Sequence, residues 1–428
     1  MFSHSINRLI SFLLLVVQWT FTTLFAQIGR TEIFDSMIKT VQVKVDGNEN
    51  VLPVINMGNA ERLQLSFDYL SHEYQRFTYN IQHCDFLGNK TESLFSSDYV
   101  YAASDDEVID DYEYSTNTTV LYTHYKLTLP NVRMRPLLSG NYRLTVFRED
   151  ETGYLKPVLH TFFAVLDNQV LIHPSISTNT DVDWNENHQQ LSLEVVCNEL
   201  KVRDANRDIK VVVMQNRRLD SAIWGPTPSA QNGTHLYWNH QRQMIFPAGN
   251  EYRKFEMLST RYPGMHIDYI RWYEPYYHVV LLEDEPRKNY LFDKDINGMA
   301  IVRCEDSAMP DIEADYVLAH FTLRMPALPN YEVYINGGWS GTGRNEEYKM
   351  TYNSEIGAYE TSVLLKLGYY NYQYLCVNPW LTSPVGETKQ IEGDFYQTQN
   401  QYDILVYYMS PGSRYQQLVG YVSPFFRP

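Results

Sequence analysis

The sequence predicts an all-β protein built from tandem immunoglobulin-like or early-set β-sandwich domains. Short segments in which apolar and polar residues alternate recur along the chain, and turn residues separate them at strand-length spacing. No segment of ten or more residues shows convincing helical periodicity. Tyrosine, with 35 residues, is unusually abundant, and its ring packs well on half-buried strands while its hydroxyl group stays in water.

The first 26 residues read as a cleaved secretory signal peptide. A single charge at Arg8 precedes an apolar run over 9–25, and the small residue Ala26 stands before Gln27. Polar residues interrupt the run, which is also shorter than the ~20 apolar residues of a spanning helix. No Cys follows Ala26, so a lipoprotein signal is not indicated. We expect a mature protein that is exported beyond the inner membrane.

Composition narrows the possible partners. The net charge of −16 makes the chain a poor general binder of nucleic acid or of anionic membrane surfaces. A hydrophobic content of 44% indicates a folded, globular chain.

We expect a first sandwich domain over 27–168. Two stretches that alternate at period two open it, and the turn Ser139-Gly140-Asn141 starts a later strand. Its strands are expected at 63–69, 77–83, 121–129, 142–147 and 161–165. Asp167 and Asn168 then read as a hinge.

A middle β-rich domain is expected over 169–312, and an early-set-like sandwich over 313–428. The middle domain contains an aromatic-rich stretch at 269–277 and an acidic turn at 283–286. Its main strands are expected at 190–198, 209–215, 235–238 and 278–282. The strands of the last domain are expected at 316–323, 331–335, 361–367, 369–375, 403–408 and 417–421.

Cysteine usage leaves two interpretations open. Cys84, Cys197, Cys304 and Cys376 lie far apart, and no CxxC pair occurs. Four thiols in an exported protein allow three disulfide pairings, but each lies near an apolar strand, so buried free thiols are equally compatible. A zinc site would need closely spaced ligand pairs, which the sequence lacks.

The sequence contains no catalytic signature. GxSxG, HExxH and the phosphate-binding GxxxxGK[ST] are absent. We interpret the acidic pairs Asp110-Asp111 and Asp293/Asp295 as solvated loop residues. The segment 293–298 resembles the start of a calcium loop, but Cys304 stands where the loop needs Glu. We therefore expect a non-enzymatic protein without metal or cofactor.

Two further patterns have a functional and a structural interpretation. The side chains of His83, Cys84 and Asp85 are of metal-binding or nucleophilic type, but neighbours on a strand point to opposite faces. We therefore predict a structural role, with Cys84 facing the core. Trp339, with rings in 369–374, would suit sugar stacking, and a secreted carbohydrate-binding sandwich is the alternative function. Because half of these rings must face the core, we favour packing.

Motifs in the first half resemble the type IX secretion system plug proteins. The segment 79–85 (YNIQHCD) resembles the family's Y-x-hydrophobic-x-H-C-D/N strand. The segments 109–118 and 122–131 match I-x-D-Y-x-x-S-x-N-T and Y-T-H-Y-x-L-x-x-P, and 139–142 matches S-G-N-Y. A Trp that the family usually has after H-C-D is replaced here by Phe86-Leu87-Gly88. The residues that carry the resemblance, and to which we assign a structural or interface role, are His83, Cys84, Asp85, Tyr112, Ser115, Asn117, Tyr122, His124, Tyr125, Ser139, Gly140, Asn141 and Tyr142.

The resemblance implies a function and a partner. A plug protein is periplasmic, associates with the outer membrane through a very large β-barrel translocon, and seals the barrel's periplasmic opening. No catalysis, cofactor or nucleic acid is needed for this role.

Overall fold

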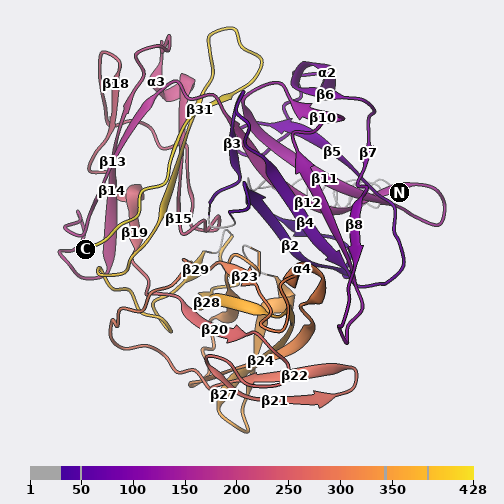
Figure 1. Cartoon of the computed structure of the whole chain (residues 1–428). Helices are drawn as coiled ribbons and strands as arrows, with labels where there is room; N and C mark the ends of the chain where they lie inside the picture. Colours follow the sequence, from indigo (N-terminus) through magenta and orange to yellow (C-terminus); the bar gives the residue numbers. More distant parts are fainter. Residues whose placement is uncertain (1–29, 49–50, 342–344, 383–384) are drawn as a thin grey trace, which may run out of the picture.

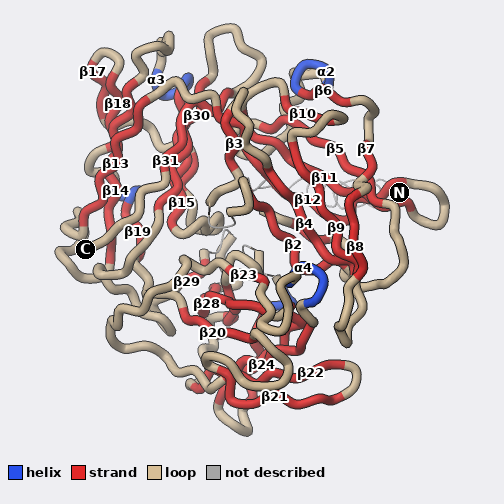
Figure 2. The backbone as a smooth tube through the Cα atoms, viewed as in Figure 1, coloured by secondary structure: helices blue, strands red, loops and turns tan. Residues whose placement is uncertain are grey.

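The computed structural model describes residues 30–48, 51–341, 345–382 and 385–428 (Figure 1). The predicted signal peptide, 1–26, lies outside the described residues. Strands dominate the fold (Figure 2), and the α-helices of the described chain are single turns. They are α2 (Ser96–Tyr99), α3 (Ala205–Asp208) and α4 (Pro310–Glu313). The all-β prediction is therefore confirmed, and the stacked sheets agree with tandem β-sandwiches.

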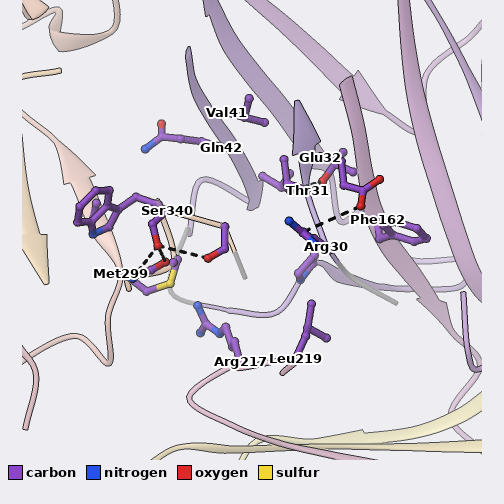
Figure 3. A pocket seen from close by; sticks show the side chains of 18 of the residues that line it. Arg30, Thr31, Glu32, Val41, Gln42, Phe162, Arg217, Leu219, Met299 and Ser340 are labelled. Atoms are coloured by element: carbon purple, nitrogen blue, oxygen red, sulfur yellow. Dashed lines mark hydrogen bonds and ion pairs between the residues drawn. The ribbon is translucent and has the colours of Figure 1, made fainter. Parts of the chain in front are cut away.

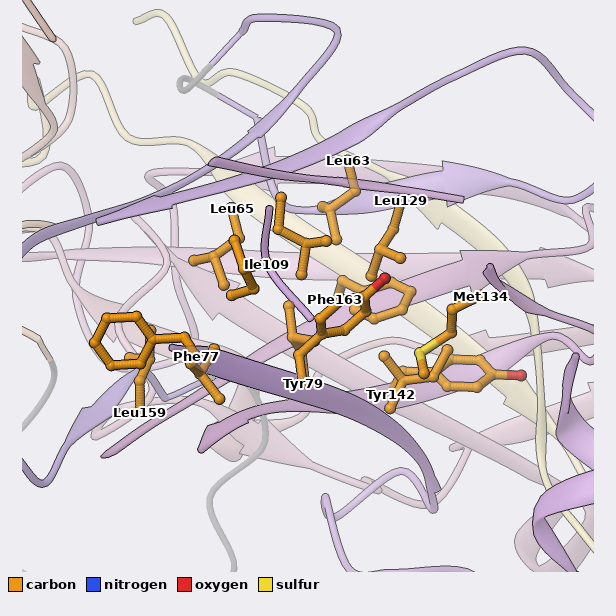
Figure 4. Packing of buried hydrophobic residues seen from close by; sticks show 14 of the residues in the cluster. Leu63, Leu65, Phe77, Tyr79, Ile109, Leu129, Met134, Tyr142, Leu159 and Phe163 are labelled. Carbon is orange, nitrogen blue, oxygen red and sulfur yellow. The ribbon is translucent and has the colours of Figure 1, made fainter. Parts of the chain in front are cut away.

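Two sheets pack face to face in the first sandwich. One contains, in order, β7 (Glu107–Val108), β5 (Phe77–Cys84), β11 (Gly140–Glu149) and β12 (Leu155–Leu166), with β1 (Glu32–Ile33) and β3 (Val54–Asn56) also paired to β12. The other contains β2 (Ile38–Val45), β4 (Leu63–Tyr69), β9 (Thr123–Leu129) and β8 (Asp111–Tyr114). Their apolar faces form one core, in which Leu63, Leu65, Tyr79 and Phe163 lie together (Figure 4). A short pair, β6 (Val100–Ala102) with β10 (Met134–Pro136), flanks it.

The second sandwich combines a middle segment with the end of the chain. One sheet contains β13 (Leu171–Ser177), β14 (His188–Val196), β18 (His235–Trp238), β17 (Ala230–Asn232) and β19 (Ile245–Pro247). The other contains β16 (Ile223–Trp224), β15 (Ile209–Gln215), β30 (Tyr402–Tyr408) and β31 (Gln417–Val422). β31 also pairs in parallel with β12 at Leu166 and Leu418, so one sheet runs from the first sandwich into the second.

The third sandwich is a ten-stranded sheet folded around its own core. Its order is β20 (Arg253–Met257), β28 (Gly368–Val377), β25 (Glu332–Asn336), β26 (Lys349–Asn353), β27 (Ala358–Lys366), β24 (Tyr316–Arg324), β22 (Tyr276–Leu281) and β21 (Ile267–Tyr273). β23 (Ala300–Val302) and β29 (Gly386–Glu387) also pair with β28. Phe255, Phe321 and Tyr372 meet in the core.

The predicted domain boundaries stay a prediction, and strand pairing crosses them at two places. Residues 253–302, placed in the middle domain, pair with strands of the segment assigned to the last domain. β30 and β31, placed in the last domain, return to β15 and β12. β30 returns to β15 because its residues Ile404 and Val406 pack with Val211 and Val213 in the core of the second sandwich. Alternation along one strand says nothing about which distant strand completes its core.

Candidate functional site

The motif residues concentrate where the first sandwich meets the other two. We call these regions the first–third joint, between β4, β9 and the loop 115–122 on one side and β24, β27 and α4 on the other, and the first–second joint, between the turns at 85–89 and 139–141 and the segment 407–416.

A buried ion pair forms the centre of the first–third joint. The Lys366 ammonium on β27 lies 2.6 Å from a carboxylate oxygen of Asp68 on β4, and the two side chains are 1% and 0% exposed. The same carboxylate accepts hydrogen bonds at 2.6 Å from the Tyr316 hydroxyl and from Nδ1 of His124. Burial by itself raises the pKa of Asp68, but Lys366 and His124 together lower it below its ordinary value. Asp68 is therefore held as an anion.

Tyr122 covers the same lysine. The Lys366 ammonium lies 4.2 Å from the centre of the Tyr122 ring and also donates to the Asp311 carbonyl at 2.6 Å. The Tyr122 hydroxyl donates to the Ala314 carbonyl at 2.9 Å. Burial raises the pKa of Tyr122, so it acts only as a neutral donor and packing group.

The loop before Tyr122 completes this joint. Ser115 fixes the loop, since its hydroxyl accepts from the Tyr122 amide at 3.0 Å. Asp315, on the third sandwich, accepts from the Thr119 amide and hydroxyl at 2.9 and 2.6 Å. Asn117 has φ of 59° and donates to Glu313 at 3.3 Å. Ser115, Asn117, Tyr122 and His124 of the predicted set thus meet in one joint.

His83 anchors the first–second joint and has no free ring nitrogen. Its Nε2 lies 3.1 Å from the Ser139 carbonyl, an obligate acceptor, so Nε2 carries the proton. Nδ1 then accepts from the Thr91 hydroxyl at 2.9 Å. The ring meets those of Tyr142 and Tyr415 edge-on, at 5.2 and 5.4 Å between centres. Burial lowers the pKa of His83, so the ring is neutral.

Gly140 and Asn141 make the contact with the second sandwich. Gly140 has φ of 133°, and a Cβ there would lie 2.4 Å from Nε2 of His83. The Asn141 amide group donates to the Asp85 carbonyl at 3.0 Å, and its oxygen accepts from the hydroxyl of Tyr407, on β30, at 2.9 Å. Of these contacts, the hydrogen bond between Asn141 and Tyr407 joins the turn of the first sandwich to the sheet of the second.

Four of the predicted residues stay within the first sandwich. The Asp85 carboxylate accepts from two amides of its own turn at 2.9 Å. The Tyr125 hydroxyl exchanges hydrogen bonds with the backbone amide and carbonyl of Gln75. The Tyr112 ring packs against the Tyr125 ring, with 5.8 Å between the ring centres. The Tyr142 hydroxyl donates to a carbonyl of its own turn at 2.8 Å. These contacts hold the four side chains within the first sandwich.

The cysteines are free thiols and are buried, which decides between the two interpretations left open by the sequence. The side chain of Cys84 is buried, as predicted, and burial raises the pKa of its thiol to about 11. A thiol held neutral in this way is a poor nucleophile.

A cavity of about 860 Å³ lies between the three sandwiches (Figure 3). Each sandwich contributes to its lining, for example Gln42 from the first, Leu219 from the second and Met299 from the third. An ion pair between Lys39 and Glu347, 2.6 Å long, joins the first and third sandwiches at this cavity. The volume of this cavity is in the range of small-molecule sites. In the described residues, no three His, Cys, Asp or Glu side chains cluster to hold a metal.

The aromatic rings considered for sugar stacking belong mainly to the third core. Tyr370, Tyr372 and Tyr374 are at most 4% exposed. The hydroxyls of Tyr372 and Tyr374 donate to Asp284 at 2.6 and 2.7 Å, and Arg253 donates to the same carboxylate at 2.6 Å. These rings therefore serve packing and a buried charge network.

One acidic side chain is less solvated than predicted. Asp295 is half-buried and accepts from the backbone amides of Tyr252 and Asn297, and burial raises its pKa to about 6. Its partner in the sequence, Asp293, is exposed and pairs with Lys254, as expected for a loop acid.

Sequence reasoning missed the charged residues at the centre of the joints and of the third core. Lys366 stands alone between Leu365 and Leu367 in an apolar strand, which is a usable signal of a buried cation. Asp68 occupies a position that alternation assigns to solvent, so nothing marked it. These missed residues are Asp68, Lys366, Asp315, Arg253 and Asp284.

Comparison with known families bears on this arrangement. Residues 38–167, which span β2 to the end of β12, match the model of the type 9 secretion system plug protein first domain. Residues 38–167 thus form a domain of the type IX secretion system plug protein family. The match includes every motif residue of both joints on the side of the first sandwich. Family membership indicates a protein of the cell envelope that associates with the outer-membrane part of this secretion system.

The whole fold also occurs in an experimental structure. The crystal structure of a hypothetical protein from Parabacteroides merdae is 39% identical, with a TM-score of 0.89 over 93% of this chain and 100% of that one. All three sandwiches are thus shared with that protein. No curated protein matches the chain. In the described residues, no helix is long and apolar enough to cross a membrane.

Proposed function

We propose that this plug-family protein binds and seals the periplasmic opening of the large outer-membrane β-barrel translocon of type IX secretion. A wide barrel encloses a water-filled lumen that leaks unless something blocks it. The blocker must be a soluble body that keeps its shape across the opening. Membership of the plug family supports this function.

The observation that carries the proposal is the construction of the joints. Asp68 and Lys366 are completely buried between two sandwiches, and separating them would leave two uncompensated charges. The pairing of β12 with β31, at Leu166 and Leu418, adds a backbone connection to the second sandwich. Three sandwiches fixed in this way move as one body, as a seal requires.

The same geometry supports a role without catalysis. His83 uses both ring nitrogens in structural hydrogen bonds, and Cys84 is a buried neutral thiol. We propose that the motif residues serve to assemble the body and that the protein carries no cofactor. Export by a cleaved signal peptide would place it in the periplasm, held at the outer membrane only through the translocon.

A pull-down from detergent-solubilised outer membranes tests this function. Tagged mature protein, starting at Gln27, is used as bait, the tag alone is the control, and bound proteins are identified by mass spectrometry. Stoichiometric recovery of one giant β-barrel protein is the expected result. Recovery of no barrel, with retention on a polysaccharide resin instead, would overturn the proposal in favour of glycan binding.

A further inference from the structure

β21 is an edge strand of the third sandwich, and its outer side has no strand beside it. It pairs with β22 and ends the strand order of its sheet. In the described residues, backbone hydrogen bonds outside this ladder reach only its first residue, Ile267, whose amide lies 3.4 Å from the Gly264 carbonyl. Residues 268–273 are mostly exposed, and Figure 1 shows this edge on the side of the third sandwich away from the other two. Their outer backbone groups therefore face solvent.

Several other edge strands carry features that discourage pairing with another chain. β8 has two acidic residues in four, and β13 contains Pro174. β7, β16 and β17 are only two or three residues long. β21 has seven residues, no proline, and one charge of each sign, Asp268 and Arg271. Its one irregularity is a register shift at its start, between Ile267 and Tyr269. An edge of this kind is a template for pairing with another strand.

The side chains of β21 are of the types found at protein interfaces. Tyr269, Trp272 and Tyr273 are 39%, 47% and 53% exposed. The guanidinium of Arg271 lies 4.8 Å from the centre of the Tyr269 ring. Interfaces are enriched in Tyr, Trp and Arg, and these residues contribute much of the binding energy. The strand thus combines an unpaired backbone edge with anchoring side chains.

We propose that β21 pairs with β21 of a second copy of this protein, antiparallel and across a two-fold axis at Ile270. An axis perpendicular to the sheet keeps each side chain on its own face, so residues that lie opposite one another are an even number of positions apart. With the axis at Ile270, the middle residue, all seven positions of the strand are paired. This inference needs no contact with the translocon and stands apart from the proposed function.

Side-chain complementarity selects this register. Arg271 of each copy lies opposite Tyr269 of the other, so the guanidinium covers a ring across the interface as it does within one copy. Asp268 lies opposite Trp272 and meets no like charge. An axis at Arg271 would place two guanidinium groups opposite each other, which destabilises a strand pair. Axes nearer the ends of the strand would pair fewer residues.

The interface is small, so the association is weak. Stable complexes bury ~1,200–2,000 Å² in total, and one strand with its flanking side chains reaches at most the low end of this range. The chain also carries a net charge of −16, which opposes association at low ionic strength. We expect a dissociation constant on the order of 10 µM at about 0.15 M salt.

Sedimentation equilibrium of the tag-free mature protein tests the dimer, from tenfold below to tenfold above that concentration. The parent should pass from monomer to dimer. Tyr269→Arg places like charges opposite each other twice and should weaken dimerisation at least tenfold. Arg271→Glu removes the guanidinium from the ring and should also weaken it. Tyr154→Arg, at a 73% exposed residue of the first sandwich, is the matched control and should dimerise like the parent.

Mixing the two weakened variants tests the register. In a mixed dimer, the new guanidinium of Tyr269→Arg lies opposite the new carboxylate of Arg271→Glu, and the second pair keeps its original residues. The mixture, with one variant fluorescently labelled, should associate at least tenfold more tightly than either variant alone. Circular dichroism and the melting temperature establish that both variants fold. Folded variants whose mixture does not recover association would overturn the proposed pairing.

Hydrogen exchange of the parent locates the interface without any substitution. The amides of 268–273 should exchange more slowly at high than at low protein concentration, while those of β8, an edge strand of the first sandwich, should not change. A parent that stays monomeric over the whole range would overturn the proposal, as would a dimer in which 268–273 exchange at the monomer's rate. Protection of 268–273 only after the translocon is added would overturn it too and would assign this edge to the barrel.

Discussion

The ammonium of Lys366 and the carboxylate of Asp68 lie 2.6 Å apart although they belong to different sandwiches, and neither side chain is more than 1% exposed. His124 and Tyr316 donate hydrogen bonds to the Asp68 carboxylate. The Tyr122 ring covers the Lys366 ammonium. Tyr122 and His124, which belong to a sequence motif, thus line a buried joint between two sandwiches.

Removing one charge of this pair should destabilise the protein strongly. Lys366→Met leaves Asp68 buried without its cation, and breaking a buried pair costs about 3–5 kcal/mol. Urea denaturation gives the free energy of unfolding. Asp68→Asn combined with Lys366→Met should lose less than the sum of the single losses. Strict additivity would mean that the two groups do not interact.

Gly140→Ala should disrupt the first–second joint. The new Cβ would lie 2.4 Å from Nε2 of His83, and the backbone has φ of 133°, so strain and crowding together should cost about 2–4 kcal/mol. Gly357→Ala is the control, since Gly357 has φ of 68° and open space around it. Equal losses of unfolding free energy in the two variants would show that the contact with His83 is unimportant.

Tyr122→Phe should weaken the first–third joint without removing its packing. The ring that covers Lys366 remains, while the buried carbonyl of Ala314 loses its donor, at a cost of about 1–3 kcal/mol. Limited proteolysis should cut the variant faster than the parent within the loop 115–122. Tyr154→Phe, at a residue that is 73% exposed, should leave both stability and cleavage unchanged.

Glu251 should make stability fall as the pH rises. Burial, with the nearby Asp295, raises the pKa of Glu251 to about 7, so between about pH 4.5 and 7 the folded state keeps a proton that the unfolded chain releases. That contribution is complete below the unfolded pKa and is lost as the pH approaches 7.

Glu251→Gln removes this titration and provides the check. The free energy of unfolding of the variant, relative to the parent, should be higher at pH 8 than at pH 5, as measured by urea denaturation at both values. A difference that is the same at the two pH values would contradict the pKa assigned to Glu251.

Much of the strand content was predictable from the sequence. β4, β15 and β18 begin and end at the predicted residues, because alternation and flanking turns mark a strand directly. The pairing of β15 with β30 was not predictable, since period two identifies a face but no distant partner. β21 and β8 were also not recognised, because exposed aromatic and acidic residues obscure their alternation.

Only the residues that the first sandwich supplies to the candidate site were predictable from the sequence. Motifs marked His83, Tyr122 and His124, which the first sandwich supplies. Asp68 and Lys366 were missed because their burial depends on the contact between sandwiches, and one strand's pattern cannot show what covers its second face. The clearest available signal was the charge of Lys366 within the apolar run from Val363 to Leu367.

Conductance of the reconstituted translocon tests the central claim most directly. The type IX secretion barrel is placed in a planar bilayer, and mature protein is added to the periplasmic side. We predict that the conductance falls in proportion to the occupied barrels and that Lys366→Met, with its joint broken, blocks less at equal concentration. Unchanged conductance at a protein concentration that saturates binding to the barrel would contradict the sealing function.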